Sequence, residues 1–455
     1  MSRRRAWLAL MGAVLAPPIA TSACSGCEKK NDTPTSSLDG AAPTVVKESL
    51  PRCRAEGLPL AIPGGDVVVG DAVVANDALF VGVVRRDESK GRRVASVMRA
   101  ALDLTGTRIV DVGPAYGEDP PPSPRAFGGA VFVAAYTRAS KADAGAARAH
   151  GDETASRVLD LVRLEGDVTL GKKEGSVVQQ ADESLAFDVA WPASGGAPLV
   201  AWDEDAPPGD AGKIDRGVVK VQLLAGDERP RVASPETADA ESPRLAPRAG
   251  GGYWLAWLAR RSEPAETASA KADDASASEG PGERRAFRWV EIVALDGKGA
   301  VVSPVRRVSP QAGRVASFDL VSTPGAELVV VVQDEAAHAE GAGERIVRYV
   351  VAEKGEAIEG VELVDAGVGQ ALADLVVPAG SEAGARWLAW TDIQERAHLA
   401  PLGPGLVASA AATTEPSLDG SRVLAAIGAD TFFVVTGAGA ADAAGQIALR
   451  RLVCR

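Results

Sequence analysis

Histidine and aromatic residues are scarce in this chain. Only three histidines occur among 455 residues, and aromatic side chains make up 4%. His150, His338 and His398 are far apart, so no pair has the spacing of metal ligands. The sequence also lacks a Gly-x-Ser-x-Gly nucleophile turn and a glycine-rich phosphate loop between a strand and a helix. These absences argue against the most familiar metal, hydrolase and nucleotide sites, and we expect no cofactor.

Positive charge is in deficit as well. The formal net charge is −12 at pH 7, whereas a nucleic-acid-binding face requires clustered lysine and arginine. The sequence contains no apolar run long enough to span a membrane. We therefore expect neither a nucleic-acid partner nor a membrane-spanning segment.

The N-terminus has the three parts of an export signal. Arg3–Arg5 form its positive region, Ala6–Ala16 form a short apolar core, and the small residues Thr21–Ala23 precede Cys24. We predict a signal peptide over residues 1–23 and a location in the bacterial cell envelope, either periplasmic or anchored to a membrane by lipid. The segment Arg4–Leu8 also resembles a twin-arginine signal, which is an alternative export route.

Ser22-Ala23-Cys24 resembles the end of a bacterial lipoprotein signal, in which the cysteine receives a lipid after cleavage. The resemblance implies lipidation of Cys24 and a membrane contact through the lipid only. The chain departs from the motif at Thr21, where an aliphatic residue is usual. Ordinary cleavage after Ala23 is the alternative.

A change of composition separates the signal from the rest of the chain. Residues 24–51 are rich in Lys, Asp, Ser, Thr and Pro, which is typical of a flexible tether. We predict that a folded body occupies residues 52–455.

Two cysteines stand at the ends of this folded body. Cys53 precedes its first strand pattern and Cys454 is the second-last residue, so in an oxidising compartment the two are natural disulfide partners. The chain-entropy relation gives a bridge over so long a loop about 5–6 kcal/mol of stabilisation. Two unrelated thiols are the alternative. Cys27 is left over, or pairs with Cys24 if that residue carries no lipid.

One short apolar phrase recurs along the folded body. It is made of Val, Leu, Ala, Phe and Trp, and it turns polar at its C-terminal end. Its copies are Leu79–Val84, Val131–Tyr136, Leu199–Trp202, Tyr253–Trp257, Leu328–Val332, Trp387–Trp390 and Phe432–Val435. Successive copies start 45 to 75 residues apart. Periods of about 40–50 residues are typical of four-stranded propeller blades, so we interpret each copy as part of one blade.

The unit around Tyr253 shows the predicted blade in full. Pro243–Ala246 is a short first strand, Tyr253–Trp257 is the second, Phe287–Leu295 alternates as the third, and Val301–Val308 is the fourth. An Asp-Gly turn at Asp296–Gly299 links the last two. We predict that every apolar run is the second strand of a blade and that the chain is nearly all β.

The last unit has only three clear strands, Arg422–Ile427, Thr431–Val435 and Gln446–Val453. Leu58–Ile62, ahead of the first unit, is the candidate for its fourth strand, and a disulfide between the chain ends would staple the same blade. We therefore predict an all-β, seven-bladed propeller of four-stranded blades, closed by mixing N- and C-terminal strands in one blade. An open array of β-sandwiches is the competing fold.

This pattern resembles the broad class of bacterial exported β-propellers, over about Leu58 to Arg455. The Trp-Asp repeat, the double-glycine kelch signature and the Ser-x-Asp-x-Gly-x-Thr-Trp sialidase box are missing from the sequence. The resemblance therefore concerns the fold and transfers no functional residue.

Carboxylates recur directly after the second strands and form the candidate site of the sequence. They are Asp87, Glu88, Asp203, Glu204, Asp205, Asp334, Glu335 and Asp392. Three low-complexity inserts leave the blades at the same point, namely Arg138–Ser156, Asp203–Arg216 and Ala259–Arg285. The shared position predicts one acidic face that attracts a cation or a basic partner. Solvated loop acids are the plainer alternative, and no particular metal is indicated.

The sequence shows no catalytic constellation. We therefore expect a non-catalytic binding or scaffold module whose partner is an envelope protein or polymer. The alternative is a hydrolase or lyase that acts on an envelope or extracellular polysaccharide through paired carboxylates. A structural envelope protein without a ligand is the third possibility. The tryptophans of the recurring runs are interpreted as packing between blades, with a carbohydrate-stacking surface as the alternative.

Overall fold

A computed structural model describes residues 52–455 with gaps, of which the widest are 139–156, 206–215, 263–285, 335–343, 377–385, 403–412 and 437–446. The chain divides into two compact units, Met1–Glu48 and Ser49–Arg455. The predicted signal peptide, Cys24 and the tether lie outside the described residues. Where the structure describes the chain, its regular elements are β-strands. This part contains no helix that is long and apolar enough to cross a membrane.

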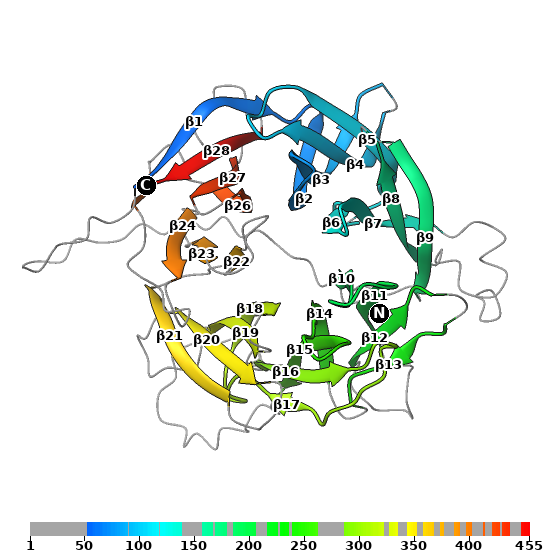
Figure 1. The fold of residues 1–455 in the computed structure, drawn as a ribbon, viewed down its shortest axis with the longest axis vertical. Coiled ribbons are helices and arrows are strands. Elements are labelled where there is room, and N and C mark those ends of the chain that lie inside the picture. The colour runs from blue at the N-terminus through cyan, green and yellow to red at the C-terminus, as the bar shows by residue number, and fades with distance from the viewer. Residues whose placement is uncertain are drawn as a thin grey trace, which may run out of the picture. The chain divides into compact units, whose positions relative to one another are not determined.

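The second unit is a ring of small antiparallel sheets (Figure 1). Five sheets have four strands in sequence order, and we number them blades 1 to 5. Blade 1 is β2 (Gly65–Ala75), β3 (Ala78–Asp87), β4 (Arg92–Ala101) and β5 (Thr107–Pro114), and blade 2 is β6 (Ser123–Phe127), β7 (Ala130–Arg138), β8 (Arg157–Glu165) and β9 (Thr169–Gln179). Blade 3 is β10 (Phe187–Ala190), β11 (Leu199–Asp205), β12 (Gly217–Leu223) and β13 (Arg231–Val232), and blade 4 is β14 (Asp239–Pro247), β15 (Tyr253–Ser262), β16 (Ala286–Leu295) and β17 (Arg306–Arg307). Blade 5 is β18 (Val315–Ser322), β19 (Glu327–Asp334), β20 (Glu344–Ala352) and β21 (Ile358–Gly367).

A narrow sheet and a wide sheet complete the ring. The narrow sheet has three strands, β22 (Asp374–Val376), β23 (Arg386–Thr391) and β24 (Ala397–Leu402). The wide sheet has five, in the order β25 (Thr413–Thr414), β1 (Arg52–Ala61), β28 (Ala448–Cys454), β27 (Thr431–Thr436) and β26 (Ser421–Ile427). We refer to the wide sheet as the closing blade.

The prediction of seven four-stranded blades is wrong. Among the described residues, six sheets have at least the four strands of a complete blade, while the narrow sheet has three. The ring therefore has six complete blades. The strand that would complete the narrow sheet by sequence order, β25, pairs in parallel with β1 instead, with Thr413 opposite Arg52. The error arises because an apolar run marks a second strand whether or not an outer strand joins its sheet.

The N-terminal strand nevertheless completes the closing blade, as the sequence predicts. β1 runs antiparallel to β28, and the strand covers Arg52–Ala61 rather than the predicted Leu58–Ile62. Cys53 lies opposite Cys454, and a disulfide joins them across 401 residues of chain. Both cysteines are buried, so the bridge is part of the packed interior of this blade.

The recurring apolar runs are the second strands β3, β7, β11, β15, β19, β23 and β27, which confirms that prediction. Their side chains alternate between the two neighbouring blades. On β15, Trp257 packs in one cluster with Leu199 of blade 3, whereas Trp254 packs in another with Leu328 of blade 5. Trp257 is fully buried and Trp254 is 2% exposed. Apolar packing between adjacent sheets therefore holds the ring together, at about 25 cal/mol for each Å² of apolar surface buried.

The outer strands of blades 3 and 4 are much shorter than the sequence predicts. The predicted fourth strand Val301–Val308 is reduced to β17, which has two residues. A serine replaces the missing ladder: Ser309 Oγ accepts a hydrogen bond from the backbone N of Val290 at 2.9 Å. Ser234 makes the same bond to the backbone N of Val219 at 3.0 Å in blade 3. The repeated Ser-Pro after each outer strand thus satisfies a buried backbone donor that would otherwise be unpaired.

Candidate functional site at the inner rim

The first strands of the sheets lie nearest the centre of the ring (Figure 1). They are β2, β6, β10, β14, β18, β22 and β26, and we refer to them together as the inner rim. Neighbouring first strands contact one another, as β2 does with β6 and β26, and β14 with β10 and β18. Equivalent positions on these strands therefore bring residues from different blades into one region.

Charged residues recur at one level of the inner rim. The opposed pairs Asp188–Ala201, Arg244–Ala256 and Asp374–Ala389 show this level, because each alanine directly precedes the tryptophan of a recurring run. Ser123 in blade 2 and Asp319 in blade 5 hold the matching position opposite Ala134 and Val331. Each first strand is thus fixed in register by the buried run beside it, and the register sets the level of the polar side chains.

Arg125 links two of these aspartates across three blades. Its Nη1 lies 3.1 Å from Asp71 Oδ2 in blade 1, and its Nη2 lies 3.0 Å from Asp188 Oδ1 in blade 3. Ser123 Oγ donates a further hydrogen bond to Asp71 Oδ2 at 2.6 Å. The Arg125 side chain is 30% exposed and that of Asp71 is 52% exposed, so this cluster is open to solvent. One guanidinium therefore holds two carboxylates at the wet inner edge of the ring.

Asp188 is more firmly held than Asp71. Its side chain is 10% exposed, and both of its carboxylate oxygens accept hydrogen bonds. Oδ2 accepts from the backbone N of Leu245 in blade 4 at 2.8 Å, and Oδ1 accepts from the backbone N of Val189 at 2.9 Å. Asp188 therefore ties blades 2, 3 and 4 together, while Asp71 presents more of its surface to solvent.

Electrostatics keep Asp71 ionised. Partial burial alone would raise the pKa of Asp71, but the positive charge of Arg125 and the hydrogen bond from Ser123 outweigh burial. The charges of Arg244 and Arg422 add to this effect, and the pKa of Asp71 is held below its usual range. Burial would likewise lower the pKa of Arg125, but Asp71 and Asp188 overcome it and raise that pKa. The cluster is a network of permanent charges at neutral pH.

The acids predicted from the sequence lie elsewhere, at the ends of the second strands. Asp203 is buried on β11, and its Oδ2 accepts a hydrogen bond from the backbone N of Ser242 in blade 4 at 2.9 Å. Asp334 is buried at the end of β19, and its Oδ1 accepts from the backbone N of Arg314 at 2.9 Å. These two carboxylates therefore satisfy backbone donors at the places where the chain enters the first strands.

The remaining predicted acids are more open or lie outside the described residues. Asp87 Oδ1 accepts hydrogen bonds from the backbone N and the Oγ of Ser89, and Asp205 is exposed at the end of β11. Asp392 is outside the described residues, as are most of the three inserts. The part of the chain that the structure describes contains no group of three His, Cys, Asp or Glu side chains placed to hold a metal. The acidic face for a cation or a basic partner stays a prediction.

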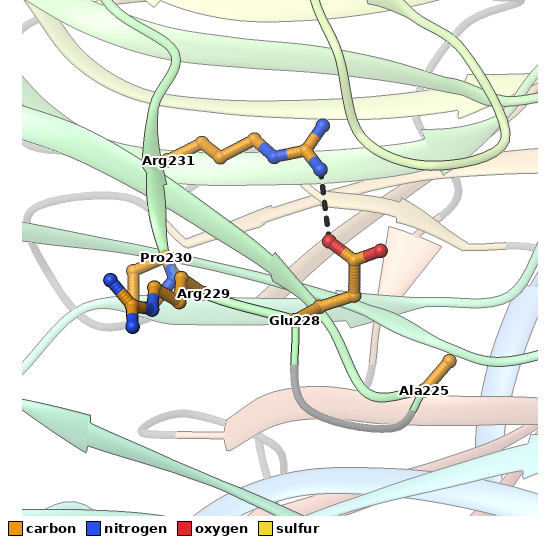
Figure 2. Close-up of a pocket in the computed structure, with 5 residues that line it drawn as sticks. All are labelled: Ala225, Glu228, Arg229, Pro230 and Arg231. Carbon is orange, nitrogen blue, oxygen red and sulfur yellow. Dashed lines mark hydrogen bonds and ion pairs between the residues drawn. The ribbon is translucent and has the colours of Figure 1, made fainter.

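The hollows of the described surface are shallow and lie away from the inner rim. One is lined by Ala225, Glu228, Arg229, Pro230 and Arg231, on the connection from β12 to β13 (Figure 2). Arg231 turns toward Glu228 and pairs with it at 2.9 Å, whereas Arg229 points the opposite way. Because this ion pair is exposed on both sides, the depression has no enclosed polar group that would select a ligand.

Sequence reasoning missed the inner-rim cluster. Pro124-Arg125 and Pro243-Arg244 both begin first strands, and this repeated Pro-Arg pair served only to mark the start of a blade. First strands are short, and their charged residues resemble the many other charges of an acidic chain. The usable signal is the register: a charge that faces the residue before a buried tryptophan lies at the rim.

The six complete blades and the closure of β1 on β28 define a β-propeller. Comparison with known proteins adds no family, because no family model and no curated protein matches the chain. Of the solved structures, the propeller domain of the Trilobed protease from Pyrococcus furiosus is 10% identical, with 85% of this chain and 93% of that chain covered and a TM-score of 0.45.

Two further solved structures illustrate the range of similar proteins. A puromycin-hydrolysing peptidase of Mycobacterium tuberculosis is 16% identical, with 84% of this chain and 53% of the peptidase covered and a TM-score of 0.40. An α-L-arabinanase of Penicillium chrysogenum is 12% identical, with 89% and 97% covered and a TM-score of 0.40. These proteins are hydrolases, but similarities this remote carry no argument about the activity of this chain.

Proposed function

We propose that this propeller hydrolyses an envelope or extracellular polysaccharide at the inner rim, with Asp71 and Asp188 as the paired carboxylates. The observation that carries the proposal is the placement of both carboxylates on a single guanidinium, that of Arg125. Their facing oxygens are separated by one guanidinium and two hydrogen bonds. Glycoside hydrolases place their two carboxyl groups roughly 5–9.5 Å apart, and the pair falls in this range of spacings.

The two carboxylates differ in the way such a reaction requires. Asp71 is solvent-exposed and its pKa is lowered, so it is an ionised base or nucleophile at neutral pH. Asp188 is the less exposed partner and takes the role of the group opposite to it. Arg125 fixes the distance between the two and balances their charge. Ser123 orients the Asp71 carboxylate through its hydrogen bond.

The test is turnover of a panel of neutral and acidic polysaccharides by the wild type, Asp71→Asn and Asp188→Asn. Loss of a general acid or base costs on the order of 10²–10⁴-fold in rate, and we expect each variant to lose that much. Asp77→Asn is the matched control, because Asp77 is an exposed aspartate in the turn between β2 and β3. Equal turnover by Asp71→Asn and the control would refute the assignment, as would the absence of any product with every polysaccharide tested.

Binding without hydrolysis is the second candidate, and a specific observation favours it. Protein donors already engage both oxygens of Asp188, and Arg125 occupies the space between the two carboxylates. Such a network suits a scaffold or binding module that holds an envelope protein or polymer. Under this alternative the wild type retains a polysaccharide in affinity electrophoresis but releases no reducing ends, and Asp71→Asn weakens retention.

Export and lipid attachment complete the proposal. The three-part signal before Cys24 supports a protein of the bacterial cell envelope that contacts the membrane through a lipid at this cysteine. Incorporation of labelled lipid into the wild type, and its loss in Cys24→Ala, would support this placement. A disulfide between Cys24 and Cys27, found by non-reducing mass spectrometry, would contradict it.

A further inference from the structure

Two arginines of the inner rim hold no carboxylate. Arg244 Nη1 donates to the carbonyl oxygen of Pro243 at 3.2 Å, and Arg422 Nη2 donates to those of Val69 at 2.9 Å and Gly70 at 2.8 Å. Neither forms an ion pair with another described residue. Both are only partly buried, so their remaining N–H donors face the solvent-accessible inner edge of the ring.

These arginines converge on the same aspartate from different blades. Arg244 is on β14 of blade 4, Arg422 is on β26 of the closing blade, and the charge of each lowers the pKa of Asp71 on β2. Arg422 contacts the backbone directly before Asp71 through its bonds to Val69 and Gly70. The carboxylate of Asp71 is already taken by Arg125 and Ser123. Arg244 and Arg422 therefore add positive charge to a network that is already neutralised.

The charges of this side of the rim do not balance. Arg125, Arg244 and Arg422 contribute three positive charges, against the two negative charges of Asp71 and Asp188. Asp319 and Asp374 hold the matching level on the neighbouring first strands β18 and β22. The inner rim thus has a basic arc formed by β26, β2, β6, β10 and β14, and an acidic arc formed by β18 and β22.

We infer that Arg244 and Arg422 bind a carboxylate of the ligand, and that the ligand is a uronate-bearing, acidic polysaccharide. This inference rests on the proposed function, because it names the substrate class of the same site. The planar guanidinium fork matches a carboxylate through two parallel hydrogen bonds, and such charge-assisted bonds are the stronger kind. A sugar acid supplies this carboxylate together with hydroxyl groups that bind to the aspartates of the rim.

The experiment measures binding of oligogalacturonate, its full methyl ester and dextran sulfate to the whole chain by calorimetry. We expect the acid to bind at least about tenfold more tightly than the ester, since a hydrogen bond to a charged group is worth about 1.5–3 kcal/mol. Arg244→Met removes only one local hydrogen bond, and we expect it to weaken acid binding by about tenfold or more. Arg163→Met is the matched control, because Arg163 is an exposed arginine on β8, away from the rim.

Arg422 requires a gentler substitution because it also joins β26 to β2. Arg422→Lys keeps the charge and removes the fork, and we expect weaker acid binding with an unchanged melting temperature. Equal affinity for the acid and its ester would overturn the inference, as would failure of wild type to bind the acid, or full binding by Arg244→Met. Equal affinity for dextran sulfate would replace carboxylate recognition by simple charge attraction and overturn it too.

The proposed function fails separately. Asp71→Asn and Asp188→Asn are assayed for turnover of the same polymers, including the neutral ones. Turnover of a neutral polysaccharide that depends on these aspartates, with no preference for the acid, would leave the proposed function standing and remove the uronate assignment. Selective, Arg244-dependent binding of the acid without any turnover would support the uronate site and remove hydrolysis.

Discussion

The first and second strands of each blade lie side by side and differ in almost every physical respect. Second strands such as β15 are buried on both faces, carry the largest side chains and repeat from blade to blade. First strands carry one charged residue at a fixed level, are partly exposed, and differ in charge between blades. Packing requires similar residues in each copy, whereas a ligand contacts each first strand differently. The layer that builds the propeller and the layer that gives it a function are therefore adjacent and distinct.

Substitution in the second-strand layer is expected to have the largest effect on stability. Trp257 is fully buried between blades 3 and 4, so Trp257→Ala leaves a cavity and lowers the free energy of unfolding by about 3–5 kcal/mol. Urea unfolding measures this loss. The control is Tyr116→Ala, at an aromatic residue that is 44% exposed, and we expect a change within roughly 0.5 kcal/mol. A loss below about 1 kcal/mol for Trp257→Ala would contradict the packing described here.

Opening the closing blade is expected to rank next. Cys53→Ser removes the bridge to Cys454, and the free energy of unfolding falls by about 2–5 kcal/mol because the unfolded chain regains its freedom. Thermal melting with and without dithiothreitol measures the effect. The reductant should lower the melting temperature of the wild type to that of the variant and leave the variant unchanged. Equal reductant sensitivity in both proteins would show that the disulfide does not stabilise the closing blade.

The serines that replace the outer ladders come third. Ser309 is buried, and Ser309→Ala leaves the backbone N of Val290 without its acceptor, so we expect a loss of about 1–3 kcal/mol in unfolding free energy. Ser89→Ala, at an exposed serine after β3, is the matched control and should change little. If the two variants unfold alike, the serine does not substitute for the strand. Hydrogen exchange at Val290 should quicken only in Ser309→Ala.

The smallest effect on stability is expected at the inner rim, and it depends on pH. An unfolded aspartate has a pKa of about 3.9, and the folded pKa of Asp71 lies below its usual range. The stabilisation from Asp71 is therefore fully present above about pH 4 and is lost as the pH falls through the folded pKa. Asp71→Asn should narrow the stability difference between pH 7 and pH 3, while Asp77→Asn should leave it unchanged. A steeper loss in Asp71→Asn would contradict the lowered pKa.

The sequence predicts the second-strand layer well because burial on both faces forces apolar residues into every copy. Leu79–Val84 and Phe432–Val435 are unlike in detail, yet both are buried second strands. The closure on β1 is predictable for a related reason: Cys53 and Cys454 mark the two strands that meet. The number of complete blades is not predictable in this way. It depends on whether short outer strands such as β25 pair within their own sheet, and no buried pattern records that choice.

The candidate site is harder to predict than the fold. Arg125 and Asp188 are 63 residues apart, and nothing local in either segment indicates that they meet. Their meeting is a consequence of the ring, which places all first strands at one centre. The acids after the second strands are easier to notice because they cluster in sequence, yet Asp203 and Asp334 bond to nearby backbone donors. Clusters in sequence and clusters in space are different sets in this propeller.

The pairing of β1 with β28 also fixes an order of events during synthesis and export. The first strand of the ring has its partner at the far end of the chain, 401 residues away at the cysteines. Blades 1 to 5 contain only strands that are close in sequence, so each can form as soon as its own segment is available. β1 must wait with an unpaired edge until the last strand emerges, and contacts of such long range are slow to form. The inner rim takes its final shape only when the last strand of the chain has joined the first.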